Sequence, residues 1–174
     1  MRRSAFGLLF TLSVLALALV PLLGSGVTTV SANGGDVCIS INGVEVVDTM
    51  LDGATCRSTE SDSGRPNIAR AYDGGSAFAG SVEGDSGNMA SATGQDSFAK
   101  AGFGDNNMAI ANGDDSRAFA EYGDNNTAIA NGDDSFAIAG GSTFGSSDNN
   151  TAIAIGACLV DASGGDETET CVVP

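Results

Sequence analysis

Internal repetition constrains this chain more than any other feature, because a repeat of fixed period folds as a stack of similar units. The three clearest units contain 19, 19 and 24 residues and occupy residues 87–105, 106–124 and 125–148. A degenerate copy begins at Asn67, and the start of a further copy ends at Gly156. The sequence therefore predicts four coils and a closing half-coil over residues 67–156.

Each unit consists of two similar halves. One half reads Asn-x-Ala-x-Ala, as in Asn126–Ala130, and the other reads Ser-x-Ala-x-Ala, as in Ser135–Ala139. Gly-Asp-Asp-Ser and Gly-Asp-Asn-Asn separate the halves, and alternation at period two between such clusters is typical of short strands and tight turns. We therefore expect an all-β fold, a parallel β-solenoid or β-roll, with two short strands per coil of about 19 residues.

The alternation also predicts which side chains face inward. The residues between the alanines include Lys100 and Arg117, and burial of either cation in a thin interior would cost several kcal/mol. The alanines should therefore form the inner columns, where a larger side chain would overpack the core. These inner positions are Ala90, Ala92, Ala99, Ala101, Ala109, Ala111, Ala118, Ala120, Ala128, Ala130, Ala137, Ala139, Ala152 and Ala154.

The two outward faces then differ in chemistry. The Ser-half face carries Phe98, Phe119, Phe136 and Ile138, interrupted by the two cations. The Asn-half face has no charged residue from its first methionine to its last isoleucine, and such a flat apolar strip is typical of an interface. We expect self-association through this strip, which comprises Met89, Met108, Ile110, Thr127, Ile129, Thr151 and Ile153.

Residues 1–32 have the pattern of a signal peptide. Arg2 and Arg3 precede an apolar run, and Val30-Ser31-Ala32 supplies small residues for cleavage. A retained membrane anchor is the alternative, although no basic stop-transfer cluster follows the run. We expect a secreted or cell-surface protein with no membrane span after leader cleavage.

The net charge of the chain limits the classes of partner that it can bind. Loss of Arg2 and Arg3 from the 7 basic residues leaves five basic against 22 acidic residues. This excess repels nucleic acid and anionic membranes. It also attracts cations, although the simpler interpretation is that it keeps a repetitive β-protein soluble.

The four cysteines lie in two pairs that flank the repeats. Cys38 and Cys56 fall in a predicted N-terminal cap (33–66), and Cys158 and Cys171 fall in a predicted C-terminal cap (157–174). Export favours disulfides. Three connectivities are possible, and we favour pairing within each cap because a stack of coils should separate the two pairs.

The unit GDNNTAIANGDDSFAIAG (123–140) resembles the YadA-like head repeats of trimeric autotransporter adhesins. The shared features are the Asn/Ser-x-Ala-x-Gly/Ala pattern, the Gly-Asp-Asn turns and the alanine column, over about residues 67–156. The resemblance implies a β-roll and slightly favours a trimer. The unit is longer than that family's, and no neck motif, coiled-coil stalk or membrane-anchoring barrel is evident. The repeats are also similar to those of small exported actinobacterial proteins, a similarity that supplies no activity.

No motif points to catalysis. Gly84-Asp85-Ser86-Gly87 matches the sequence around a serine-protease nucleophile, but the chain has no His to act as its base. The acidic pairs lie on repeated turns, whereas a glycosidase needs two carboxyl groups in distinct environments. We therefore expect a non-catalytic protein, and we interpret 84–87 as a turn at a coil junction.

The acidic turns suggest a Ca²⁺ site, because stacked Asp and Asn oxygens suit this ion. The candidate ligands form one stack of Asp96, Asp114 and Asp133 and a second stack of Asp105, Asp124 and Asp148. The alternative is that Asp and Asn are turn formers and that Asn ladders join the edges.

We therefore expect a structural or adhesive solenoid that acts through its flat faces, as a homo-oligomer or on a surface ligand. A calcium-dependent binding module is the second hypothesis. An ice-binding solenoid is a third, less supported because Met89 and Met108 interrupt the column of Thr127 and Thr151.

Overall fold

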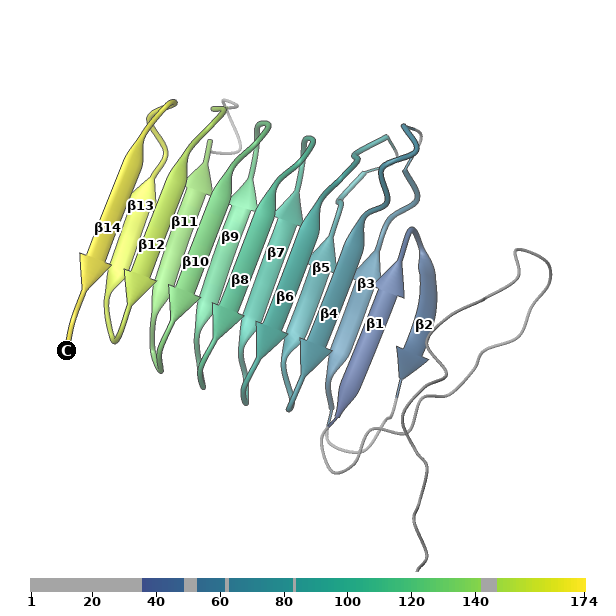
Figure 1. The fold of residues 1–174 in the computed structure, drawn as a ribbon, viewed down its shortest axis with the longest axis horizontal. Helices are drawn as coiled ribbons and strands as arrows, with labels where there is room; N and C mark the ends of the chain where they lie inside the picture. Colours follow the sequence, from purple (N-terminus) through teal and green to yellow (C-terminus); the bar gives the residue numbers. More distant parts are fainter. Residues whose placement is uncertain (1–35, 49–52, 62, 83, 142–146) are drawn as a thin grey trace, which may run out of the picture.

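The computed structural model describes residues 36–48, 53–61, 63–82, 84–141 and 147–174. The signal peptide expected over 1–32 lies outside them. The described chain is all-β and forms two sheets (Figure 1). Sheet A has the spatial order β14 (Thr168–Val172), β12 (Thr151–Ile155), β10 (Thr127–Asn131), β8 (Met108–Asn112), β6 (Met89–Thr93), β4 (Ile68–Tyr72), β1 (Val37–Ile41), β2 (Val44–Asp48). Sheet B has the order β13 (Leu159–Ala162), β11 (Phe136–Gly140), β9 (Arg117–Glu121), β7 (Phe98–Gly102), β5 (Ser76–Ala79), β3 (Thr55–Ser58).

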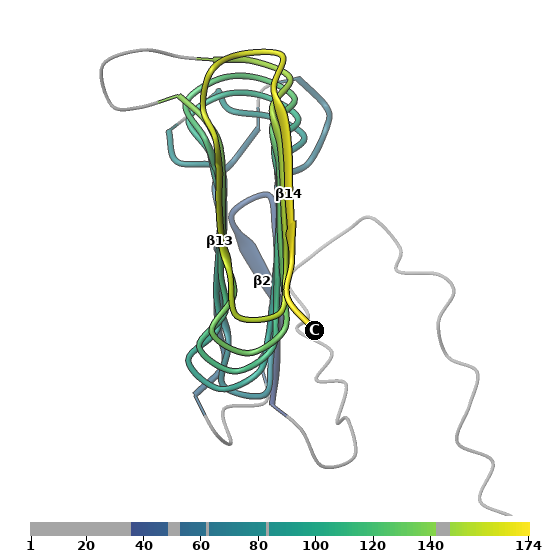
Figure 2. The same ribbon diagram turned by 90° about the vertical axis from the view of Figure 1, so that its left-hand side faces the viewer.

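The chain alternates between the two sheets and so winds a parallel β-solenoid. Seen along the stack, the sheets form two facing layers joined by turns at both ends (Figure 2). Equivalent repeat positions pair directly: Ala128 of β10 lies between Ala109 of β8 and Ala152 of β12. These pairings confirm the predicted fold class.

The structure contains about six coils rather than the expected four and a half. The difference lies in the flanking segments, which lack the alanine repeat. β3 pairs with β5 in sheet B, and β13 and β14 extend the two sheets beyond β11 and β12. Backbone pairing with a neighbouring coil thus continues the stack in segments that lack the repeat sequence.

The inner columns consist of alanine, as predicted. Every alanine expected to face inward is at most 1% exposed, and Ala69, Ala71, Ala77 and Ala79 continue the same columns toward the N-terminus. The largest fully buried side chains are not apolar. They are five asparagines and three serines at the turns: Asn67, Asn88, Asn107, Asn126, Asn150, Ser97, Ser116 and Ser135.

Backbone geometry requires glycine and favours aspartate in the turns. Gly113 has φ +128°, and a Cβ there would lie 2.5 Å from the carbonyl carbon of Gly132 in the next coil. Asp115 has φ +55°, a left-handed conformation that Asp and Asn tolerate better than most residues. The Gly-Asp-Asp turns therefore allow one coil to lie close against the next.

At the N-terminal end, β1 pairs antiparallel with β4, and β2 folds back along β1. Figure 2 shows β2 leaning from sheet A across the space between the layers. The predicted disulfide between Cys38 of β1 and Cys56 of β3 is formed, with a Cα–Cα distance of 5.6 Å. It joins sheet A to sheet B at this end of the stack.

At the C-terminal end, Cys158 and Cys171 are thiols in this structure. Both pack against the alanine core, and Cys158 raises the pKa of the Cys171 thiol, chiefly through a side-chain hydrogen bond. Cys171 pairs with Ala154, so it continues an inner column of sheet A. The second disulfide stays a prediction. No helix that could cross a membrane occurs in the described segments.

Candidate functional site: the two outward sheet faces

The outward face of sheet A is a regular aliphatic and hydroxyl surface. Parallel pairing aligns Met89, Met108, Thr127 and Thr151 in one column. The adjacent column is formed by Ser91, Ile110, Ile129 and Ile153. All are half-buried, and no charged side chain projects from this face between β6 and β12. The seven residues expected to form an interface are therefore brought together on one surface.

The outward face of sheet B carries aromatic rings and cations. Each of two columns alternates between the two kinds of residue: Phe98, Arg117 and Phe136 in one, and Phe78, Lys100 and Phe119 in the other. Because the columns are out of phase, the rings meet diagonally, within the reach of aromatic side chains. Ring centroids lie 5.5 Å apart for Phe78–Phe98 and Phe98–Phe119, and 5.7 Å apart for Phe119–Phe136.

A second aromatic pair lies in the turns that leave sheet B. The rings of Phe103 and Tyr122 stack at 4.6 Å with an interplanar angle of 4°. Both residues have positive φ, 55° and 58°, which is costly for bulky side chains. The Lys100 ammonium lies 4.7 Å from the Phe103 ring centroid. This pair is not among the residues singled out from the sequence, although Phe103 and Tyr122 occupy equivalent positions of successive units, a spacing that aligns them in neighbouring coils.

Lys100 also forms an ion pair with Glu121. Glu121 lies on the neighbouring strand β9, two residues after Phe119, the residue that pairs with Lys100. Burial raises the pKa of Glu121, and the hydrogen bond and charge of Lys100 partly oppose this rise. Arg57 and Arg117, the other two cations of this face, have no ion-pair partner among the described residues. The face therefore presents two unpaired guanidinium groups on a strongly acidic chain.

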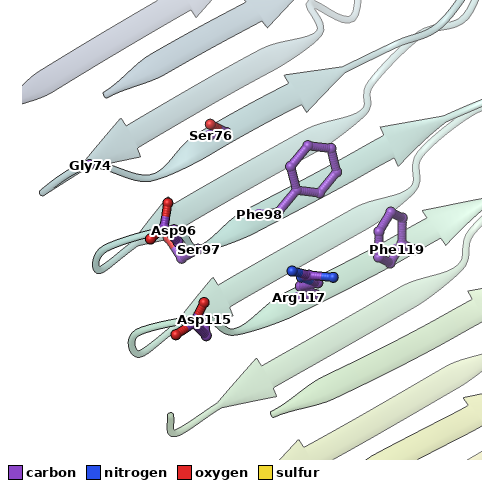
Figure 3. Close-up of a pocket in the computed structure, with 8 residues that line it drawn as sticks. All are labelled: Gly74, Ser76, Asp96, Ser97, Phe98, Asp115, Arg117 and Phe119. Carbon is purple, nitrogen blue, oxygen red and sulfur yellow. The ribbon is translucent and has the colours of Figure 1, made fainter. Parts of the chain in front are cut away.

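Two shallow hollows lie on this face. The larger, of about 490 Å³, covers the beginnings of β5, β7 and β9 and includes Ser76, Phe98, Arg117 and Phe119. Figure 3 shows these side chains on neighbouring strands, with Asp96 and Asp115 in the turns that lead into them. The smaller hollow, of about 250 Å³, covers the ends of β3, β5 and β7 and is lined by Arg57, Thr59, Phe78, Gly80, Ser81, Lys100 and Phe103.

The aspartates of the acidic turns accept hydrogen bonds from backbone N–H groups of neighbouring coils. Asp105, Asp124 and Asp148 align as expected, since the N–H of Asp105 donates to Asp124 Oδ1 at 2.8 Å and that of Asp124 donates to Asp148 Oδ1 at 2.9 Å. On the opposite edge, the N–H of Asp114 donates to Asp133 Oδ1 at 3.0 Å. Each of these carboxylates thus satisfies a turn N–H of the preceding coil.

The expected position of Asp96 in the stack of Asp114 and Asp133 is wrong. The N–H of Gln95, not of Asp96, donates to Asp114 Oδ1. Phe98 pairs with Arg117, so two residues earlier Asp96 aligns with Asp115. No group of three His, Cys, Asp or Glu suited to a metal ion occurs among the described residues. The hydrogen bonds favour the interpretation that these aspartates form the turns over the hypothesis that they bind Ca²⁺.

The predicted alternative of an asparagine ladder is present and buried. The N–H of each ladder asparagine donates to the Oδ1 of its equivalent one coil earlier, at 2.9–3.0 Å from Asn88 to Asn150. The Gly84–Gly87 segment lies beside this ladder in a turn, where the Ser86 hydroxyl donates to Asp105 Oδ1. Ser86 therefore stabilises the turn through this hydrogen bond.

Comparison of the chain with protein-family models, curated proteins and solved structures gave no match. Its function is therefore inferred from the two outward faces of the solenoid.

Proposed function

We propose that this protein is a non-catalytic structural and adhesive module of the cell surface or extracellular space, which associates with copies of itself through the outward face of sheet A. The supporting observation is the absence of charge on that face from β6 to β12, on a chain with a net charge of −15.

Electrostatics favours this face for contact between copies. Like charge on two protomers opposes association, and the opposition is weakest where no carboxylate projects. The turns at both edges of the sheet carry aspartates, so contact through the edges brings like charges together. The exposed Asp114 and Asp124 are examples on the two edges.

The shape of the face also suits a symmetric interface. Its columns repeat from strand to strand, so a copy related by rotation meets the same pattern of Met, Thr and Ile. Apolar side chains that lie singly on a surface need no explanation, but two adjacent columns of them form a patch. The resemblance to trimeric adhesin heads slightly favours three copies.

Sedimentation at micromolar concentration tests the proposal. The chain from Asn33 should be oligomeric, and Ile110→Asp/Ile129→Asp should be monomeric, because two carboxylates per protomer would be buried in the contact. Ile138→Asp/Leu159→Asp is the matched control, since it adds the same charge to sheet B and should stay oligomeric. A monomeric wild type would overturn the proposal. Equal oligomers of the wild type and the sheet A variant would move the interface to another surface.

A further inference from the structure

The aromatic residues of the described chain are concentrated on one side of the solenoid. Six of the seven project from sheet B or from the turns that leave it, and Tyr72 of sheet A is the exception. The six are Phe78, Phe98, Phe103, Phe119, Tyr122 and Phe136. None belongs to the alanine core, so packing of the interior does not account for them. The strands β6 to β12 of sheet A carry no aromatic residue, so the sheets of this solenoid form without aromatic rings.

We propose that the outward face of sheet B binds an uncharged linear polysaccharide. This goes beyond self-association, because it uses the opposite face. The C–H groups on one side of a sugar ring are apolar and pack against the negative face of an aromatic ring. The half-buried Phe78, Phe98, Phe119 and Phe136 form a continuous row suited to such contacts.

The polar groups beside the rings match sugar hydroxyls, which both donate and accept hydrogen bonds. In the larger hollow, the guanidinium of Arg117 supplies donors only, and the carboxylates of Asp96 and Asp115 supply acceptors only. Ser76 adds a hydroxyl of its own. Because Arg117 has no ion-pair partner among the described residues, its donors are available to a ligand.

The layout of the hollows favours a chain over a small molecule. A small ligand is usually buried for most of its surface, and two shallow hollows cannot do this. They lie at opposite ends of the sheet B strands, and the contact between Phe98 of the larger hollow and Phe78 of the smaller links them. A linear polymer that crosses the strands obliquely would occupy both hollows and gain contacts from each ring.

The charge of the chain favours an uncharged polymer. Five basic residues stand against 22 acidic ones outside the leader, so an anionic polymer would be repelled on approach. Two of the three cations of sheet B do little to reverse this, because Lys100 is paired with Glu121 and Arg117 lies beside two aspartates, which leaves Arg57 as the one cation without a nearby carboxylate in the two hollows.

Binding to cellulose, chitin, xylan and mannan, by sedimentation with the insoluble polymers and affinity electrophoresis with the soluble ones, tests the proposal. The wild type should bind at least one of them. Phe98→Ala/Phe119→Ala should weaken that binding by about tenfold or more, since two ring contacts are lost. Arg117→Gln should weaken the binding several-fold. Because Arg117 is exposed, this substitution should leave the fold intact. Ile110→Asp/Ile129→Asp on sheet A should retain binding, which separates this proposal from self-association.

Three results would overturn the proposal. The first is no binding to any of the four polymers. The second is equal binding by the wild type and both sheet B variants, with thermal melting showing that all are folded. The third is binding to the polyanion alginate alone, which would assign the face to anionic ligands. If Phe98→Ala/Phe119→Ala instead changes the sedimentation coefficient without any polysaccharide, the occupant of the face is a second copy of the chain.

Discussion

The side chain of each alanine in the inner columns is a single methyl group, and these alanines are almost fully buried. Ala128 is 0% exposed and lies between Ala109 and Ala152 along its column. Protein interiors are close-packed, so a larger side chain in such a column must displace neighbouring atoms. Ile129, one residue later, is half-buried on the outward face and has room for a change of shape.

We therefore expect Ala128→Leu to be destabilising and Ile129→Leu to be tolerated. Overpacking of a core typically costs about 1–3 kcal/mol, whereas an exchange of Ile and Leu on a partly exposed surface costs less. Thermal or denaturant unfolding of the two variants beside the wild type measures the difference. Equal shifts in melting temperature would show that the alanine columns are not the tightly packed side.

At the scale of the strand and its turn, the coils are joined by side-chain ladders as well as by the backbone. Asn126 is fully buried, and its Oδ1 accepts from the N–H of Asn150 at 3.0 Å. Its own N–H donates to Asn107 Oδ1 at 2.9 Å. Each asparagine thus supplies the acceptor for a buried turn N–H that has no strand partner, which explains why a polar residue occupies the interior at every coil.

Asn126→Ala should therefore destabilise the solenoid by about 1–3 kcal/mol, the usual cost of a buried donor without a partner. Asn112→Ala is the matched control, since Asn112 is exposed and its amide bonds only to the exposed Asn131 at 3.2 Å. Urea unfolding of both variants gives the comparison. A larger loss for the Asn112 variant would contradict a stabilising role for the buried ladder.

At the scale of the whole molecule, the two ends of the stack resemble each other, because each has a pair of cysteines between the two sheets. Cys38 pairs with Ala71 and Cys171 pairs with Ala154, so both cysteines occupy the same inner column of sheet A at its opposite ends. Cys56 lies in β3 of sheet B, and Cys158 lies beside the same sheet, where its carbonyl accepts from the N–H of Phe136 in β11. A disulfide at each end would join the two sheets where no further coil holds them together, and would hold the terminal strands that otherwise fray.

We expect the secreted protein to form Cys158–Cys171 as well as Cys38–Cys56. A loop of this size contributes about 3 kcal/mol in the chain-entropy model, so Cys171→Ser should lower the melting temperature of the oxidised protein and leave that of the reduced protein nearly unchanged. Peptide mapping without reductant identifies the links directly. Free thiols at the C-terminal pair, or a link between Cys38 and Cys171, would contradict this expectation.

The sequence by itself determined the solenoid, its two strands per coil and the inward direction of the alanines. These features follow from local pattern: period two defines the faces, the Gly-Asp turns end the strands, and the cost of burying Lys100 or Arg117 selects the inner side. The uncharged columns of sheet A could be assigned in the same way, because equal spacing in successive repeats places equivalent residues side by side.

Only the tertiary structure decided which residues of non-identical segments meet. It placed β3, β13 and β14 in the sheets although they lack the repeat. It also brought the four Phe rings of sheet B into diagonal contact and stacked Phe103 on Tyr122. The physical reason is that lateral neighbours in this fold are about one coil apart in sequence, and their register is set by backbone hydrogen bonds between coils, which all residue types form alike.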